Sequence, residues 1–211
     1  MAKEVTKEGE APKACNSNRV IPRPSRAEAE KAVEILLRWA GEDPTREGLL
    51  ETPARVVRAY EEFFAGYGMD AAAELTKTFE DIQGFDDIVL VKDIDFVSHC
   101  EHHIAAITGR AHVAYWPAAK VVGISKLARV VDIFAKRMVS QENMTSQIVK
   151  TIDEALQPKG VAVYIEADHQ CMSIRGVNKP GSSTVTTTFS GIFKTDADAR
   201  ERFFAMIGNK K

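Results

Sequence analysis

The sequence has few cysteines, no long apolar run and almost no net charge. Its 211 residues hold three cysteines, Cys15, Cys100 and Cys171, and so sparse and odd a set excludes a disulfide framework. No apolar run could span a bilayer, and the first residues lack a signal-peptide core, so we expect a cytoplasmic protein without a membrane partner. Lys and Arg number 28 against 30 Asp and Glu, a net charge of −2, which argues against a nucleic-acid partner.

What is present is an ordinary globular composition. Hydrophobic residues make up 45% and charged residues 27%, which is enough apolar material for one sizeable core or two small ones. Changes in composition along the chain predict four regions. They are a flexible N-terminal tail over 1–24, a helical region over 25–66, a poorly defined connection over 67–87, and an α+β domain over 88–211.

The N-terminal region has two strong helix signals. Ser25 and Glu28 form a capping-box pattern at the start of a helix that we expect to end at Gly41. A second helix is predicted from Thr52-Pro53, because proline is favoured at the first helical position. Arg55 and Arg58 lie three residues apart and therefore share one side of this helix.

The rest of the chain changes from helical to extended texture and back. Helices are predicted from Ser125 to Met138 and from Asn143 to Leu156, and a short helix carrying Phe203 ends the chain. Strands are predicted over 88–97, 105–116, 161–175 and 184–193. The resulting order, β-β-α-α-β-β, predicts an α+β fold with an antiparallel sheet.

The densest chemical cluster is the run from Cys100 to His103, Cys-Glu-His-His. A Cys and a His separated by two residues can reach one metal ion from a tight turn, although an isolated pair of this kind is often coincidental. On the predicted strand over 161–175, alternate residues share a face, which places His169, Cys171, Ser173 and Arg175 together. Two cysteines and one histidine with an open fourth position are typical of catalytic zinc. Cys15, in the predicted tail, is interpreted as a spare exposed thiol.

Four motifs together resemble GTP cyclohydrolase I, over roughly residues 25–207. They are CEHH at 100–103, GISKLAR at 123–129, SQE at 140–142 and HQCMSIRG at 169–176. The resemblance implies a tunnelling fold, in which β-β-α-α-β-β units assemble side by side into barrels. It also implies a homodecamer with active sites between subunits and Zn²⁺ held by Cys100, His103 and Cys171. The implied reaction opens the imidazole ring of GTP at C8, releases formate and forms 7,8-dihydroneopterin triphosphate, an early step of folate or other pterin biosynthesis.

The resemblance also implies roles for the remaining site residues. His169 is expected to donate a proton to the purine ring nitrogen with help from His102, and Ser125 to act on the ribose, although helix capping is an equally good interpretation of this serine. Glu142 is expected to accept hydrogen bonds from guanine, with Gln141 beside it. The triphosphate requires clustered cations, and five match family positions: Lys126, Arg129, Arg175, Arg55 and Arg58, the last two expected from a neighbouring subunit.

Two positions depart from the common pattern, and two other classes of function compete. Position 58 is arginine where lysine is common, and His99 stands where a small or apolar residue is more usual and could compete for the metal. His99 and His112 are expected to be surface or core histidines.

Other tunnelling-fold enzymes, such as nitrile reductases and pterin synthases, lack this Cys-His-Cys set. A catalytically silent zinc module is disfavoured because both proton carriers and the cations are present.

Overall fold

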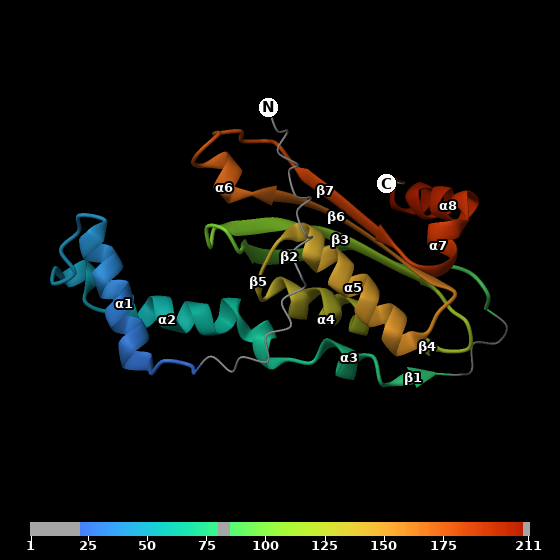
Figure 1. Cartoon of the computed structure of the whole chain (residues 1–211), viewed down its shortest axis with the longest axis horizontal. Helices are drawn as coiled ribbons and strands as arrows, with labels where there is room; N and C mark the ends of the chain where they lie inside the picture. The colour runs from blue at the N-terminus through green and yellow to red at the C-terminus, as the bar shows by residue number, and fades with distance from the viewer. Residues whose placement is uncertain (1–21, 80–84, 209–211) are drawn as a thin grey trace, which may run out of the picture. The chain divides into compact units, whose positions relative to one another are not determined.

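The computed structural model describes residues 22–79 and 85–208, and the chain divides into two compact units, residues 1–54 and 55–211 (Figure 1). Cys15 and most of the predicted tail lie outside the described residues. The first unit contains α1 (Arg26–Trp39), the 3-10 helix η1 (Glu47–Leu49) and the first residues of α2 (Thr52–Phe63). The predicted capping box is confirmed, since the Glu28 amide donates to Ser25 Oγ at 3.3 Å and the Ser25 amide donates to the Glu28 carboxylate at 2.8 Å.

The second unit continues α2 and contains the sheet. Its remaining elements, in chain order, are η2 (Ala65–Gly68), α3 (Ala71–Glu74), β1 (Thr78–Phe79), β2 (Val89–Cys100), β3 (Ala106–Trp116), β4 (Val121–Val122), α4 (Ile124–Ala135), β5 (Met138–Val139), α5 (Gln141–Leu156), β6 (Gly160–His169), α6 (Gln170–Ser173), β7 (Thr184–Phe189), α7 (Gly191–Thr195) and α8 (Ala197–Gly208).

A five-stranded sheet in the order β5-β2-β3-β6-β7 forms the centre of this unit. All neighbours are antiparallel except β5, which runs parallel to β2. The strands β1 and β4 form a separate antiparallel pair. The register sets the two ends of the sheet: Val89 pairs with Tyr115 at one end, and Ile107 pairs with His169 at the other.

Alternate strand residues face two apolar layers. Helices α4 and α5 cover one face, where Leu127 and Ile148 are buried with Val113 and Ile165 of the strands. Helices α7 and α8 pack on the opposite face through Phe193 and other buried residues. Burial of one such large side chain contributes about 1.5–3 kcal/mol, so the two layers fix the position of the strand ends that carry the site.

The α+β prediction is confirmed, and the long strands and helices follow the predicted order β-β-α-α-β-β, as β2, β3, α4, α5, β6 and β7. The connection over 67–87 contains α3 and β1, for which the sequence carries only weak signals. Among residues 22–79 and 85–208, no helix combines the length and the apolar character needed to cross a membrane.

The prediction of one strand over 161–175 is wrong beyond His169. Strand β6 ends at His169, opposite Ile107 of β3, and its pairing with β7 has already ended at Ala167. With no strand continuing on either side, the backbone turns into the short helix α6, in which the Ile174 amide donates to the Gln170 carbonyl at 3.1 Å. The segment over 184–193 is likewise only a strand to Phe189.

Candidate metal centre and active site

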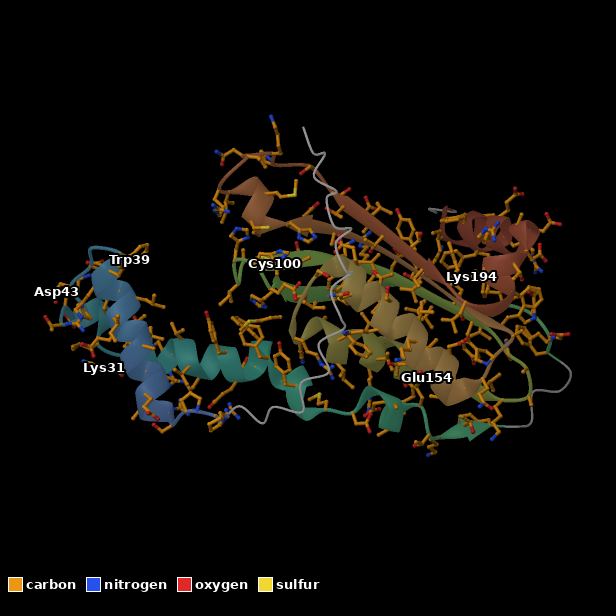
Figure 2. The ribbon with its side chains drawn as sticks, in the orientation of Figure 1. Lys31, Trp39, Asp43, Cys100, Glu154 and Lys194 are labelled. Carbon is orange, nitrogen blue, oxygen red and sulfur yellow. The ribbon has the colours of Figure 1, made fainter. Side chains whose placement is uncertain are left out.

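A tight turn between β2 and β3 brings Cys100 and His103 together. The Cys100 amide donates to the Ala105 carbonyl, and the Ile104 amide donates to the Cys100 carbonyl, both at 2.9 Å. Ile104 has a φ of +53°, which closes the turn. Cys100 is buried at the end of β2 (Figure 2), and its Sγ lies 4.0 Å from His103 Nδ1.

Cys171 completes a possible metal-binding group. It comes from α6, which follows β6, and the ligand atoms of Cys100, His103 and Cys171 all lie within 4.8 Å of one another. Burial raises the pKa of the Cys171 thiol, and the neighbouring Cys100 raises it further. A metal cation between the two sulfurs has the opposite effect, because it stabilises the thiolates. The donor set therefore fits a metal ion. The convergence predicted from the sequence is present, although Cys171 reaches the group from a helical turn and not from a strand.

Arg175 lies against this group. Its Nη1 donates to His103 Nε2 at 2.8 Å. The guanidinium can only donate, so it places a fixed positive charge beside the group. The position suits an anionic ligand close to the metal-binding residues.

The two candidate proton carriers have different surroundings. His169, the last residue of β6, is partly buried, and its Nε2 lies 2.8 Å from Gln141 Oε1. Burial lowers the pKa of His169, while the carboxylates of Glu142 and Asp168 oppose this shift. The side chain of His102 is 72% exposed, and its Nε2 lies 3.9 Å from the Glu101 carboxylate. The structure therefore holds one imidazole firmly and leaves the other in solvent.

Helix α5 places Gln141 and Glu142 beside His169. Ser140 caps this helix, since its Oγ accepts from the Asn143 amide at 3.3 Å. Glu142 lies in the first turn and is exposed. Gln141 is 3% exposed and is fully engaged with the strands β6 and β7. Only Glu142 of this pair is open to a ligand.

Lys126 and Arg129 do not join the metal-binding group within one chain. The Val122 amide donates to Tyr115 Oη at 3.1 Å, which places the start of α4 at the Val89 end of β2. Cys100 is the last residue of that 12-residue strand, which spans roughly 35 Å. Figure 1 shows the two ends, with β4 at one and α6 at the other.

Glu74 of α3 holds both cations in place. Lys126 Nζ lies 2.7 Å from Glu74 Oε2, and Arg129 Nη1 lies 3.4 Å from the same atom. Hydrogen bonding from Lys126 is the main reason that the pKa of Glu74 is lowered. The sequence carries no signal for this contact, because Glu74 lies in the segment with weak patterns. The capping interpretation of Ser125 is wrong, since α4 is capped by Gly123 and makes no side-chain cap bond.

The arginines of α2 lie on exposed positions one helical turn apart, at residues 55 and 58. The end of α2 is anchored by His99, whose ring lies 4.6 Å from that of Phe63 and 5.3 Å from that of Phe64. His99 is thus a core residue, as is His112, and it is not a member of the metal-binding group.

Comparisons with known proteins agree with this geometry. A sequence model of the GTP cyclohydrolase I family matches residues 29–208. The chain is 60% identical to GTP cyclohydrolase 1 of Maricaulis maris over 88% of this chain and 90% of that protein. It is 59% identical to GTP cyclohydrolase 1 of Hyphomonas neptunium over 89% of this chain and 91% of that protein. The enzyme of the same name from Sinorhizobium fredii is 58% identical, over 88% of this chain and 90% of that protein.

One solved structure, archaeosine synthase QueF-Like in the apo form, aligns with 49% of this chain and 93% of its own. Its TM-score is 0.42 and its identity 19%, so this weak likeness adds nothing to the assignment. The match of the family sequence model and the identity to the three relatives are sufficient: the chain belongs to the GTP cyclohydrolase I family of hydrolases.

Proposed function

We propose that the chain is a zinc-dependent GTP cyclohydrolase I that converts GTP to 7,8-dihydroneopterin triphosphate and formate, as the first step of tetrahydrofolate or other pterin biosynthesis in the cytoplasm. GTP as substrate follows from the family. The observation that carries the zinc assignment is the convergence of the ligand atoms of Cys100, His103 and Cys171 within 4.8 Å of one another. Cys171 follows His169 by two residues, at the end of β6.

Zn²⁺ suits this group because two thiolates and one imidazole are ligands that it prefers. Three protein ligands leave one coordination position open, as in catalytic zinc sites. When bound, zinc supplies a Lewis acid that activates water for attack on C8 of the purine.

The histidines move the protons that this reaction requires. Two waters are consumed in removing C8 as formate, and one is released when the freed amine condenses with the carbonyl derived from ribose, so one water is consumed overall. The ring nitrogen must gain a proton before the C–N bond can break. We assign this donation to His169, which is held in place by Gln141 at 2.8 Å, and an assisting role to the exposed His102.

Glu142 is assigned to guanine. N1–H and the 2-amino group of guanine lie side by side, and one carboxylate can accept a hydrogen bond from each. Glu142 is exposed at the start of α5. Burial lowers the pKa of His169, and the Glu142 carboxylate is close enough to oppose that shift. A purine held by Glu142 would therefore lie beside the proposed proton donor.

The triphosphate is assigned to Lys126, Arg129 and Arg175, together with Arg55 and Arg58. Arg175 lies at the metal-binding group, whereas Lys126 and Arg129 lie toward the opposite end of the sheet. The long distance between Arg175 and the two cations of α4 within one chain supports a site that forms between subunits. A second copy would then supply the start of α4, including Ser125. In that arrangement Ser125 acts on the ribose.

We propose a homodecamer as the assembly that brings these ends together. In the described part of the chain, β7 pairs with β6 on one side and no strand pairs with its other side. An unpaired strand edge can extend a sheet across a subunit boundary. Side-by-side joining of such sheets is how tunnelling folds close into barrels.

The direct test is to incubate the purified, zinc-loaded protein with GTP and to measure formate and the neopterin chromophore together. We expect both products in equal amounts. Loss of activity on chelation and recovery with Zn²⁺ would support the metal assignment. Absence of both products from protein with zinc demonstrably bound would contradict the proposed function. Formate without the chromophore would limit the activity to the removal of C8, without closure of the new ring.

A further inference from the structure

Gln141 is a buried polar side chain that contacts the proposed proton donor directly. It is 3% exposed at the first position of α5, and every polar atom of its amide has a partner. Its Oε1 lies 2.8 Å from His169 Nε2. The two hydrogens on its Nε2 are shared among three acceptors: the Ile165 carbonyl at 3.2 Å, the Thr184 carbonyl at 2.9 Å and Thr186 Oγ1 at 3.1 Å.

These partners determine which way the amide points. The backbone carbonyls of Ile165 and Thr184 can only accept hydrogen bonds, so the NH₂ group of Gln141 must face them. The amide oxygen then faces His169, and because this oxygen can only accept, His169 Nε2 must carry the hydrogen. The other ring nitrogen, Nδ1, is left without that hydrogen in the neutral ring.

Two threonine hydroxyls reinforce this direction. Thr145 Oγ1 donates to the backbone carbonyl of Gln141 at 2.7 Å. The same hydroxyl oxygen lies 2.7 Å from Thr186 Oγ1. Since the single hydroxyl hydrogen of Thr145 is already used, Thr186 must donate to Thr145, and its lone pairs accept from the Gln141 amide. The hydrogen bonds of α5, β6 and β7 thus form one directed network that ends at His169.

We propose that Gln141 is a positioning residue that fixes the ring orientation and the tautomer of His169, with hydrogen on Nε2 and with Nδ1 left to hold or move the proton during the reaction. This inference rests on the proposed function of His169. It gives Gln141 a different role from Glu142, its neighbour in sequence, because Gln141 acts through the histidine and does not touch guanine.

Steady-state kinetics with GTP separate these two roles. Gln141→Met keeps the length of the side chain and removes its hydrogen bonds, and we expect kcat to fall about 100-fold with KM for GTP changed less than about threefold. Glu142→Gln is the comparison variant, for which KM is expected to rise. Zinc content should equal that of the wild type, since the hydrogen bonds of Gln141 within the described residues include none of the three metal-binding residues. A raised KM with unchanged kcat in Gln141→Met would overturn the proposal.

A spectroscopic measurement tests the tautomer without reference to activity. In zinc-loaded protein labelled with ¹⁵N at histidine, the ring signals of His169 are identified by their loss in His169→Gln. At about pH 8, above the ordinary pKa of histidine, we expect the wild type to carry hydrogen on Nε2 and Gln141→Met to show a mixture of tautomers. Hydrogen on Nδ1 in the wild type would refute the inference even if GTP is turned over. If GTP is not turned over, the proposed function fails while this measurement still decides the tautomer.

A milder pair of variants covers the case in which Gln141→Met does not fold. Thr186→Val removes one acceptor of the Gln141 amide, and we expect kcat to fall about fivefold, the effect of one neutral hydrogen bond. Thr188→Val is the matched control on the same strand face, because Thr188 contacts Ser146 at 3.5 Å and not Gln141. Equal effects of the two threonine variants on kcat would contradict the proposed network.

Discussion

The two ends of the five-stranded sheet differ in how their functional side chains are held. At one end, backbone hydrogen bonds and the buried amide of Gln141 fix Cys100 and His169. At the other, Lys126 and Arg129 are long side chains held by the single carboxylate of Glu74. A group that performs chemistry requires fixed geometry, whereas a group that binds phosphate requires mainly charge. In the proposed site, the first end therefore draws its groups from one chain, whereas the second would act only across a boundary between subunits.

Loss of one thiol should give the largest effect at the metal end. For Cys171→Ala we expect zinc content near zero and formate release reduced about 1000-fold or more, because the ligand set falls to two. Elemental mass spectrometry and a formate assay measure the two quantities on the same sample. Cys15→Ala is the control thiol and should retain both. Full turnover in Cys171→Ala would show that this thiol is not a ligand.

Mixed assemblies test whether the two ends act across subunits. Cys171→Ala and Lys126→Met should each be nearly inactive alone, but after joint unfolding and reassembly in equal amounts we expect about a quarter of wild-type activity. This fraction is the chance that an intact metal end meets an intact cation end in a heterologous interface. The control mixes Cys171→Ala with His103→Ala, which share the same end and should stay inactive. Recovery in the control, or none in the test mixture, would contradict a shared site.

A smaller effect is expected when Glu74 is neutralised. If Lys126 and Arg129 bind the triphosphate as proposed, Glu74 competes with the phosphates for both cations. Glu74→Gln should then lower KM for GTP about fivefold, as a partly exposed ion pair permits. Glu154→Gln is the matched control, since Glu154 forms its ion pair with Lys150, at 3.8 Å on the exposed side of α5, and neither Lys126 nor Arg129 is its partner among the described residues. A raised KM in Glu74→Gln would show instead that the carboxylate is needed to orient the two cations.

The smallest effect concerns His112, in β3 between the two ends. Burial lowers the pKa of His112 below its ordinary value of 6.5, and its Nδ1 accepts from the Asp93 amide at 3.3 Å. The folded state therefore binds this proton less readily than the unfolded state, and the stabilisation present above pH 6.5 is lost as the pH falls below that value. In His112→Gln the acid-induced drop in melting temperature should be smaller by about 2 °C. An unchanged drop would assign acid sensitivity to other groups.

The fold was predictable where local patterns carry the information. The capping box at Ser25, the proline start of α2 and the alternation of β3 each correspond to an observed element. The end of the strand predicted over 161–175 was not predictable, because it depends on where β3 and β7 cease to pair with β6. That is a property of residues distant in sequence, which a local pattern does not contain.

The site was predictable in its residue types and not in its contacts. The spacing of Cys100 and His103 and the family motifs pointed to the group that the fold assembles. Neither could show that Glu74 pairs with the cations of α4, or that Gln141 faces His169 and is closed to solvent. Both contacts join side chains separated by 28 or more residues, and tertiary packing alone decides them.

The metal-binding group also joins two distant parts of the chain. Cys100 and His103 come from one hairpin, and Cys171 follows 71 residues after Cys100. An ion held by all three would act as a reversible cross-link that restricts the unfolded chain, as a disulfide does. Loop-closure entropy for a segment of this length corresponds to about 4 kcal/mol. The same atoms would then set both the reactivity of the site and the resistance of the sheet to unfolding, so removal of the ion would weaken the fold as well as the chemistry.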